Sequence, residues 1–202
     1  MVASHASKSK ELSTTHLNNN TPNYLVSFKI LMNSNDNVTS SMVNHTYCNK
    51  NDDDNHPFTI YHQNIQGLKG KTNKLMLSLF SEMPQLICLS EHHLKYSEME
   101  LAHIPTYELG AKYCRTALKY GGVCIYIQKN IKFSSINLQK YCKERDWEIA
   151  AVKLKFPKKN VIAFCVYRAT MGDFDYFLKQ IHTILNSLCN PKTEFILSGD
   201  LI

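Results

Sequence analysis

The sequence predicts an α/β domain in which a mixed β-sheet carries helices on its face. The first observation is that three apolar runs each deliver one oxygen-bearing side chain at their C-terminal end, namely Asn64, Glu91 and Asp200. The second is that a helical pattern separates the first two runs, whereas alternating patterns of the antiparallel type follow them. Chemistry in α/β sheets usually lies just past the carboxyl ends of the strands, so these residues are the first site candidates.

Length and composition are those of one folded domain with a tail. Of the 202 residues, 44% are hydrophobic, which is enough for a sizeable core. The net charge of +6 comes almost entirely from lysine. It suits either a polyanionic partner such as nucleic acid or an ordinary solvated lysine surface.

Cysteine usage and hydropathy indicate the compartment. The seven cysteines are scattered without a CxxC pair, which favours a reducing compartment over a disulfide framework or a zinc site. The N-terminus lacks the apolar core of a signal peptide, and no apolar run reaches the length of a membrane span. We therefore expect an intracellular protein of the nucleus or cytoplasm that is not secreted and has no membrane partner.

Residues 1–56 are predicted to be a disordered polar tail. They are dominated by Ser, Thr, Asn, His and Lys and close on the polar run Asn51–Asn55. Such a composition cannot bury enough apolar surface to offset the entropy of ordering the chain. The folded domain is expected to cover residues 57–202.

The first part of this domain predicts a βαβ unit. A strand begins at Phe58, and Gly67 can end it at no steric cost. Apolar residues at helical spacing predict an amphipathic helix over 73–83. Pro84 stops that helix, and the strand Leu86–Ser90 follows. The two strands should be parallel, since a helix connects them.

The rest of the domain predicts antiparallel strands and one further βαβ-type step. Ser97–Glu100 fits a capping box and predicts a short helix before Pro105. An amphipathic helix is expected over Phe174–Leu188, and a last strand over Glu194–Ser198. Between these helices the sequence predicts four strands, of which the last two are joined by a hairpin loop at 157–160: Tyr107–Tyr113, Val123–Gln128, Trp147–Phe156 and Val161–Tyr167.

Each candidate oxygen ligand has a second interpretation. A carboxylate at the end of a buried strand, such as Glu91, is costly unless it is paired or holds a cation, but it could also emerge into solvent. Asn64 could be only a turn residue, and the Gly-Asp pair that contains Asp200 is common in turns.

Four other residues stand near the predicted strand ends. His92 and His93 are adjacent, so their rings point in different directions, and a surface or hydrogen-bonding role is favoured over zinc. Tyr167 suits packing with a wetted hydroxyl. Arg168 suits phosphate recognition, although an ordinary surface arginine is the default.

The sequence lacks a Gly-rich phosphate loop, a Gly-x-Ser-x-Gly elbow and a zinc-protease helix. The set that is present consists of Asn, Glu and Asp with a tyrosine and an arginine. It suits Mg²⁺ held by few carboxylates and completed by water and a substrate phosphate.

Five short motifs occur in an order that resembles one known family. They are HQNIQGL, LICLSEHHL, GGVCIYI, CVYRATMGDFDYFL and FILSGD. Together they resemble the endonuclease/exonuclease/phosphatase superfamily, most closely the endonuclease domain of non-LTR (LINE-type, jockey-like) retrotransposon polyproteins. The resemblance covers the chain from Phe58 to its C-terminus and implies a two-sheet α/β sandwich.

The resemblance also implies roles for individual residues. Asn64 and Glu91 match the residues at the metal, which is Mg²⁺ with Mn²⁺ as the alternative, and no other small-molecule cofactor is implied. Tyr167 matches the tyrosine that binds the scissile phosphate, and Asp200 matches the aspartate that positions and deprotonates water. The implied reaction is in-line hydrolysis of a DNA phosphodiester. Arg168 is the candidate for DNA binding.

The sequence departs from the family pattern near its end. The asparagine expected two residues after Asp200 is Ile202, and the family's final segment, with a further Asp and a His, is not present. The resemblance thus covers roughly the first two-thirds of the domain. We expect a truncated copy with little or no nuclease activity. Two alternatives stay open: a non-catalytic remnant that binds nucleic acid or nothing, and a phosphatase of the same fold.

Overall fold

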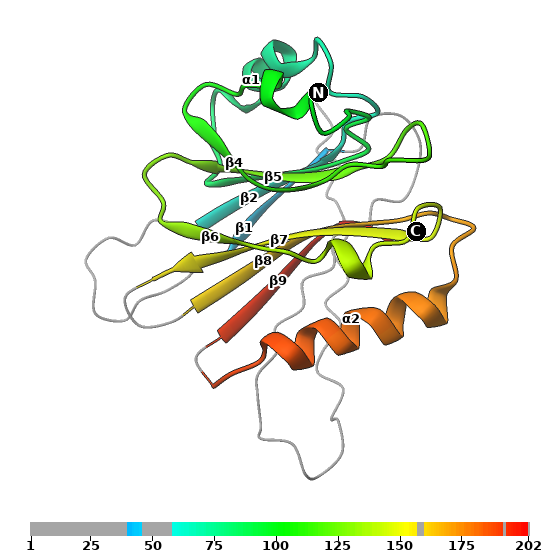
Figure 1. Ribbon diagram of the computed structural model, residues 1–202. Coiled ribbons are helices and arrows are strands. Elements are labelled where there is room, and N and C mark those ends of the chain that lie inside the picture. The colour runs from blue at the N-terminus through cyan, green and yellow to red at the C-terminus, as the bar shows by residue number, and fades with distance from the viewer. Residues whose placement is uncertain (1–39, 46–57, 157–159, 192, 202) are drawn as a thin grey trace, which may run out of the picture.

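Two β-sheets packed face to face make up the centre of the molecule, with one helix outside each sheet (Figure 1). The computed structural model describes residues 40–45, 58–156, 160–191 and 193–201. This arrangement confirms the predicted two-sheet α/β sandwich.

The first sheet contains five strands in the order β1-β2-β3-β5-β4. As predicted, β2 and β3 are parallel and are connected by helix α1 (Thr72–Leu79), and the other neighbours are antiparallel. The strands of this sheet are β1 (Ser40–His45), β2 (Phe58–Asn64), β3 (Leu86–Ser90), β4 (Tyr107–Tyr113) and β5 (Val123–Gln128).

The second sheet contains four strands in the order β6-β7-β8-β9. The first three are antiparallel, and β9 returns parallel to β8 after helix α2 (Phe174–Leu188). The bounds of its strands are β6 (Phe133–Ile136), β7 (Trp147–Lys155), β8 (Asn160–Arg168) and β9 (Thr193–Asp200).

Two predicted helices differ from the structure. Helix α1 ends at Leu79 rather than at residue 83, and the chain passes through a turn in which Met83 has φ of +36°. The predicted capping box of Ser97–Glu100 does not form: only a 3₁₀ turn, η1 (Met99–Leu101), follows, and no side chain caps it. The Glu98 carboxylate accepts the Lys95 N–H at 3.0 Å. A second 3₁₀ turn, η2 (Gln139–Tyr141), was not predicted.

Three strands also correct the prediction. Ser40–His45, inside the expected disordered tail, forms β1 along β2, while the rest of that tail lies outside the described residues. The short strand β6 was not predicted. Strand β9 runs on through Gly199 and Asp200, so the Gly-Asp pair belongs to the sheet and not to a turn.

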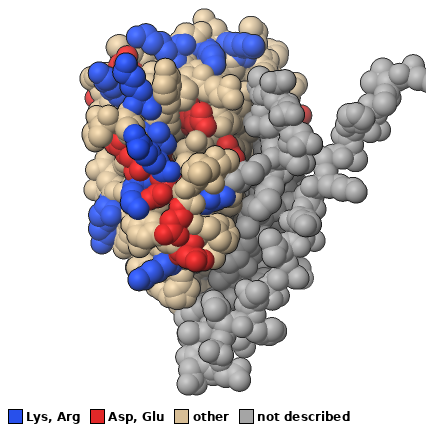
Figure 2. Space-filling model, turned by 90° about the vertical axis from the view of Figure 1, so that its right-hand side faces the viewer, with Lys and Arg blue, Asp and Glu red and all other residues tan. Residues whose placement is uncertain are grey.

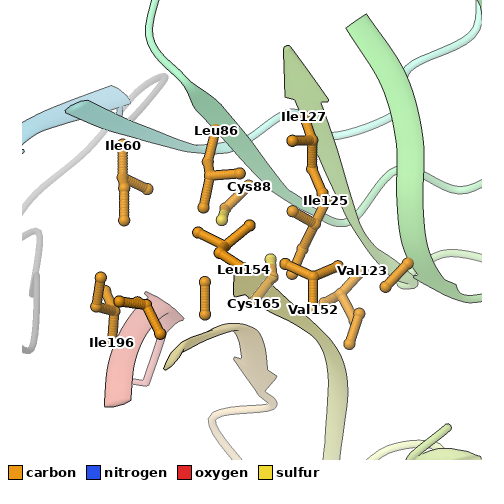
Figure 3. Packing of buried hydrophobic residues seen from close by; sticks show 14 of the residues in the cluster. Ile60, Leu86, Cys88, Val123, Ile125, Ile127, Val152, Leu154, Cys165 and Ile196 are labelled. Atoms are coloured by element: carbon orange, nitrogen blue, oxygen red, sulfur yellow. The ribbon is translucent and has the colours of Figure 1, made fainter. Parts of the chain in front are cut away.

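Apolar side chains pack in three layers that match the alternation of the strands. The middle layer lies between the sheets: Figure 3 shows Ile60, Leu86, Cys88 and Ile125 of the first sheet facing Val152, Leu154, Cys165 and Ile196 of the second. The outer layers join the first sheet to α1 and the second sheet to α2. Among the described residues, no helix is long and apolar enough to cross a membrane.

Helix α2 begins at a side-chain cap, which allows a local prediction. Asp173 lies at the N-cap position, and its Oδ1 accepts the Tyr176 N–H at 2.9 Å. Replacing Asp173 by alanine should lower the free energy of unfolding by about 1 kcal/mol, because one of the free N–H groups of the first turn loses its acceptor. Asp173→Asn should keep most of this stability in urea unfolding; equal losses in both variants would contradict the capping role.

Candidate functional site

Three predicted residues meet where strands of the two sheets end. One N–H₂ group, the Nδ2 of Asn64 at the end of β2, donates to Glu91 Oε1 and to Asp200 Oδ2, each at 3.0 Å. Glu91 follows β3, which is parallel to β2, and Asp200 ends β9 in the other sheet. The amide of Asn64 therefore joins two carboxylates that lie far apart in the sequence.

Backbone hydrogen bonds hold the segment that carries Glu91. The carbonyl of Glu91 accepts the Gly67 N–H at 2.8 Å, and the His93 N–H donates to the Gly121 carbonyl at 2.8 Å. The segment is thus fixed on one side by the turn after β2 and on the other by the start of β5. Glu91 itself has φ of +55°, an uncommon conformation for a residue other than glycine. Such backbone strain is typical of functional sites.

Tyr167 lies beside this cluster on β8. It is paired with Asp200 across the parallel β8–β9 register, so the two side chains project from the same face of the sheet. Burial raises the pKa of the Tyr167 phenol, and the nearby Glu91 carboxylate raises it further. The phenol is therefore protonated at neutral pH and can donate a hydrogen bond.

The two adjacent histidines have different environments, as the sequence indicated. His92 is fully buried, its Nδ1 accepts the Leu94 N–H at 3.0 Å, and its Nε2 lies 2.9 Å from the Tyr113 carbonyl. Burial lowers the pKa of His92 to about 4, so the ring is neutral and donates through Nε2. This is the hydrogen-bonding role that was favoured over zinc, although it is played in the interior.

His93 lies at the edge of the cluster. Its Nε2 is 3.4 Å from Glu91 Oε2 but forms no hydrogen bond of good geometry among the described residues. Its ring packs edge-on against Tyr120, with 5.0 Å between the ring centroids. Burial lowers the pKa of His93, and Glu91 opposes this shift only in part. His93 therefore adds little positive charge beside Glu91 at neutral pH.

Arg168 is not brought together with the other predicted residues. Its guanidinium donates at 3.2 Å to the carbonyls of Leu201, Ala169 and Gly172, and it lies over the Phe174 ring. These contacts hold the connection from β8 to α2. The predicted contact of Arg168 with DNA stays a prediction, and the observed contacts are structural.

Two charged residues next to Tyr167 were missed by the sequence interpretation. Arg115 follows β4, and Glu148 lies on β7 opposite Tyr167. They form an ion pair that is nearly enclosed, with 12% of the Arg115 side chain and 0% of the Glu148 side chain exposed. A signal in the sequence is that Glu148 shares its face of the strand with the apolar residues Ala150, Val152 and Leu154.

The donor set of the cluster fits a divalent cation. The carboxylates of Glu91 and Asp200 are hard oxygen ligands and both accept the N–H₂ group of Asn64, whose own amide oxygen accepts the Gln66 N–H at 3.3 Å. Within the described ranges, no group of three or more His, Cys, Asp or Glu side chains is placed to enclose a metal ion. Two carboxylates are compatible with Mg²⁺, which is usually held by one or two carboxylates with water and phosphate completing the shell.

The surface charge is mixed on the side of the molecule shown in Figure 2. Lys and Arg side chains gather along its upper edge, and acidic and basic side chains alternate below. The described residues show no continuous basic stripe on this face. The charge pattern there does not by itself indicate a nucleic-acid partner.

Comparison with solved structures identifies the fold. TDP2 of D. rerio, humanized by 14 mutations, is similar to this chain with a TM-score of 0.51 and 15% sequence identity over 70% of the chain. AP endonuclease LMAP from Leishmania major has a TM-score of 0.52 with 18% identity over 70% of the chain. The chain has the endonuclease/exonuclease/phosphatase fold.

Other comparisons complete this picture. D. rerio TDP2 in complex with a single-strand DNA product matches with a TM-score of 0.51 and 14% identity over 70% of the chain and 59% of its own length. The endonuclease domain of TRAS1, a telomere-specific non-LTR retrotransposon, has a TM-score of 0.48 and 11% identity over 67% of the chain and 56% of its own length. The chain spans 64% of the humanized TDP2 and 54% of LMAP. No family model and no curated protein sequence matches it.

Proposed function

We propose that the cluster of Asn64, Glu91, Asp200 and Tyr167 is the site of a divalent-metal-dependent phosphodiesterase that acts on DNA. The observation that carries this proposal is the amide of Asn64 between two carboxylates, at 3.0 Å from each, at the strand ends of this fold. The fold neighbours include AP endonuclease LMAP and a TDP2 bound to a DNA product, which supports a nuclease-type function.

Each residue would have a separate role in the reaction. Glu91 would hold Mg²⁺ or Mn²⁺, which would supply positive charge beside the phosphate oxygens, and Asn64, whose N–H₂ group donates to Glu91, would keep that carboxylate in place. The Asp200 carboxylate would take a proton from the attacking water as the water oxygen bonds to phosphorus. The opposite P–O ester bond would break, and the leaving oxygen would take a proton from solvent. The protonated Tyr167 phenol would donate to a phosphate oxygen, where charge develops.

DNA is preferred as the substrate because the motif resemblance is closest to retrotransposon endonucleases. In such an element, the nick supplies the primer for reverse transcription. The alternative within this fold, a phosphatase for lipid or sugar phosphates, would use the same metal site. The two therefore differ in substrate and not in the metal-binding residues.

The first test measures Mn²⁺ binding to the chain, and the electron paramagnetic resonance signal of the free ion is the readout. Glu91→Gln keeps the size of the side chain and an oxygen that can accept the Asn64 N–H₂ group, but it removes the negative charge. It should weaken Mn²⁺ binding by about 10–100-fold or more. Glu82→Gln, the same change at an exposed glutamate, is the control and should leave binding unchanged. No Mn²⁺ binding by the native chain, or equal binding by Glu91→Gln, would contradict the proposal.

The second test compares substrates with the same variants. Nicking of supercoiled plasmid that requires Mg²⁺ and Glu91 would establish DNA hydrolysis and overturn the low activity expected from the sequence. Glu91-dependent release of phosphate from a phosphomonoester, without nicking, would favour the phosphatase alternative.

A further inference from the structure

A buried ion pair lies directly behind Tyr167 and has no role in the proposed chemistry. Arg115 Nε donates to Glu148 Oε1, and the second oxygen, Oε2, accepts the Gly122 N–H at 2.6 Å. Glu148 is completely buried, and burial raises its pKa, which Arg115 opposes. A buried carboxylate is costly unless both oxygens are satisfied, so this geometry is closely specified.

The ion pair reaches from one sheet to the other and contacts Tyr167. Arg115 belongs to the connection between β4 and β5 in the first sheet, whereas Glu148 and Tyr167 are register partners on β7 and β8 of the second. Paired residues project from the same face, so Glu148, Tyr167 and Asp200 form a row across three strands. The guanidinium carbon of Arg115 lies 5.9 Å from the centre of the Tyr167 ring, within cation–π range.

The segment that follows Arg115 is held more firmly than an ordinary surface loop. A second glutamate, Glu144, accepts the backbone N–H groups of Thr116 at 2.7 Å, Ala117 at 3.2 Å and Leu118 at 2.8 Å. The absence of a side chain at Gly121 makes room for Arg115, because a Cβ there would overlap the guanidinium. The loop is thus built to present Arg115 in one position.

We propose that Arg115 is a positioning residue of the site: held by the Glu148 carboxylate, its guanidinium plane keeps the Tyr167 ring beside Glu91 and Asp200. This inference rests on the proposed function, since Tyr167 is there the phosphate donor. The planar guanidinium can meet a carboxylate and an aromatic ring at the same time, which a lysine ammonium does less well. Glu148 holds Arg115 in this position.

If the ion pair were purely structural, replacing Arg115 by lysine would leave the Tyr167 ring in place. If Arg115 positions the ring, the same substitution should let the ring move. Lysine keeps a positive charge for Glu148 but loses the plane over the ring. The double variant Arg115→Gln/Glu148→Gln removes both charges together, which is often tolerated when one charge alone is not. Arg145→Lys, the same change at an exposed arginine, is the matched control.

The test uses the full chain labelled with 3-fluorotyrosine, with the Tyr167 resonance assigned from Tyr167→Phe. Bound Mn²⁺ broadens fluorine signals steeply with decreasing distance, so the broadening at Tyr167 reports the place of its ring relative to the metal. We expect strong broadening in the native chain and in Arg145→Lys. Arg115→Lys and the double variant should lose at least half of this broadening while their Mn²⁺ affinity stays within about twofold of native, because the metal residues are untouched.

The outcomes separate the two proposals. Native broadening in both Arg115 variants, with Mn²⁺ bound, would overturn the positioning role and leave the proposed function standing. If Mn²⁺ does not bind the native chain, the proposed function fails. The metal-free spectrum then decides whether Arg115 holds the ring: an unchanged Tyr167 signal in Arg115→Lys overturns the inference, and a signal that shifts and broadens supports it.

Discussion

Replacing Gly199 by alanine is expected to prevent stable folding. A Cβ at this position would overlap the backbone carbonyl oxygen of Val166 and lie 2.7 Å from its carbonyl carbon. Both groups belong to the paired strands β8 and β9, so neither can move aside as a flexible side chain would. We expect a loss of more than about 4 kcal/mol in the free energy of unfolding, a large part of the total for a domain of this size.

Urea unfolding of Gly199→Ala beside Ser198→Ala tests this expectation. The neighbouring hydroxyl of Ser198 is buried and finds no hydrogen-bond partner among the described residues. Its removal should change stability by less than about 1 kcal/mol, since no hydrogen bond is lost. A tolerated substitution changes the free energy of unfolding by about 1 kcal/mol or less. If Gly199→Ala lowers it by no more than that, β9 is not packed as closely on β8 as the structure shows.

As the pH is lowered, the fold is expected to lose stability at a pH well above that at which most carboxylates titrate. Burial lowers the pKa of His62 to about 4, and burial lowers that of His92 to about 4 as well. In the unfolded chain both rings take up protons near pH 6.5. Their contribution is therefore fully present above pH 6.5 and is lost progressively as the pH falls toward 4. The loss is on the order of 3 kcal/mol for each ring.

The measurement is the urea midpoint of the metal-free chain at intervals between pH 7.5 and 4.5. His62→Gln should flatten the pH dependence, because glutamine does not titrate, and should give a smaller loss between pH 6.5 and 4.5 than the native chain. His103→Gln, at an exposed position, should leave the slope unchanged. A native slope in His62→Gln would show that the ring is already charged, or hydrated, in the folded state.

Local patterns predicted most of the elements. The bounds of β4, β5 and α2 were those expected: helical spacing is complete within α2, and β5 is an apolar run bounded by Gly121–Gly122 and Lys129–Asn130. Strand β1 escaped prediction because its polar sequence shows no such pattern, and its backbone hydrogen bonds depend on β2. The short strand β6 likewise depends on pairing with β7.

The candidate site divides in the same way. Asn64, Glu91 and Asp200 could be selected because each follows an apolar run, and the motif resemblance added Tyr167. The sequence did not indicate that one amide would bridge both carboxylates, since these residues come from two sheets. Nor did it indicate that Arg168 would bind backbone carbonyls while Arg115 lies at Tyr167.

By itself, then, the sequence determined the α/β class, the order of most strands and helices and the oxygen-bearing residues at the strand ends. These follow from side-chain periodicity and backbone preference, which act over a few residues. Only the tertiary structure decided that Gly199 lies in a strand, that His92 is neutral in the interior and that Glu148 is satisfied by Arg115. Each of these depends on contact between segments distant in the chain, where burial decides which polar groups must find partners.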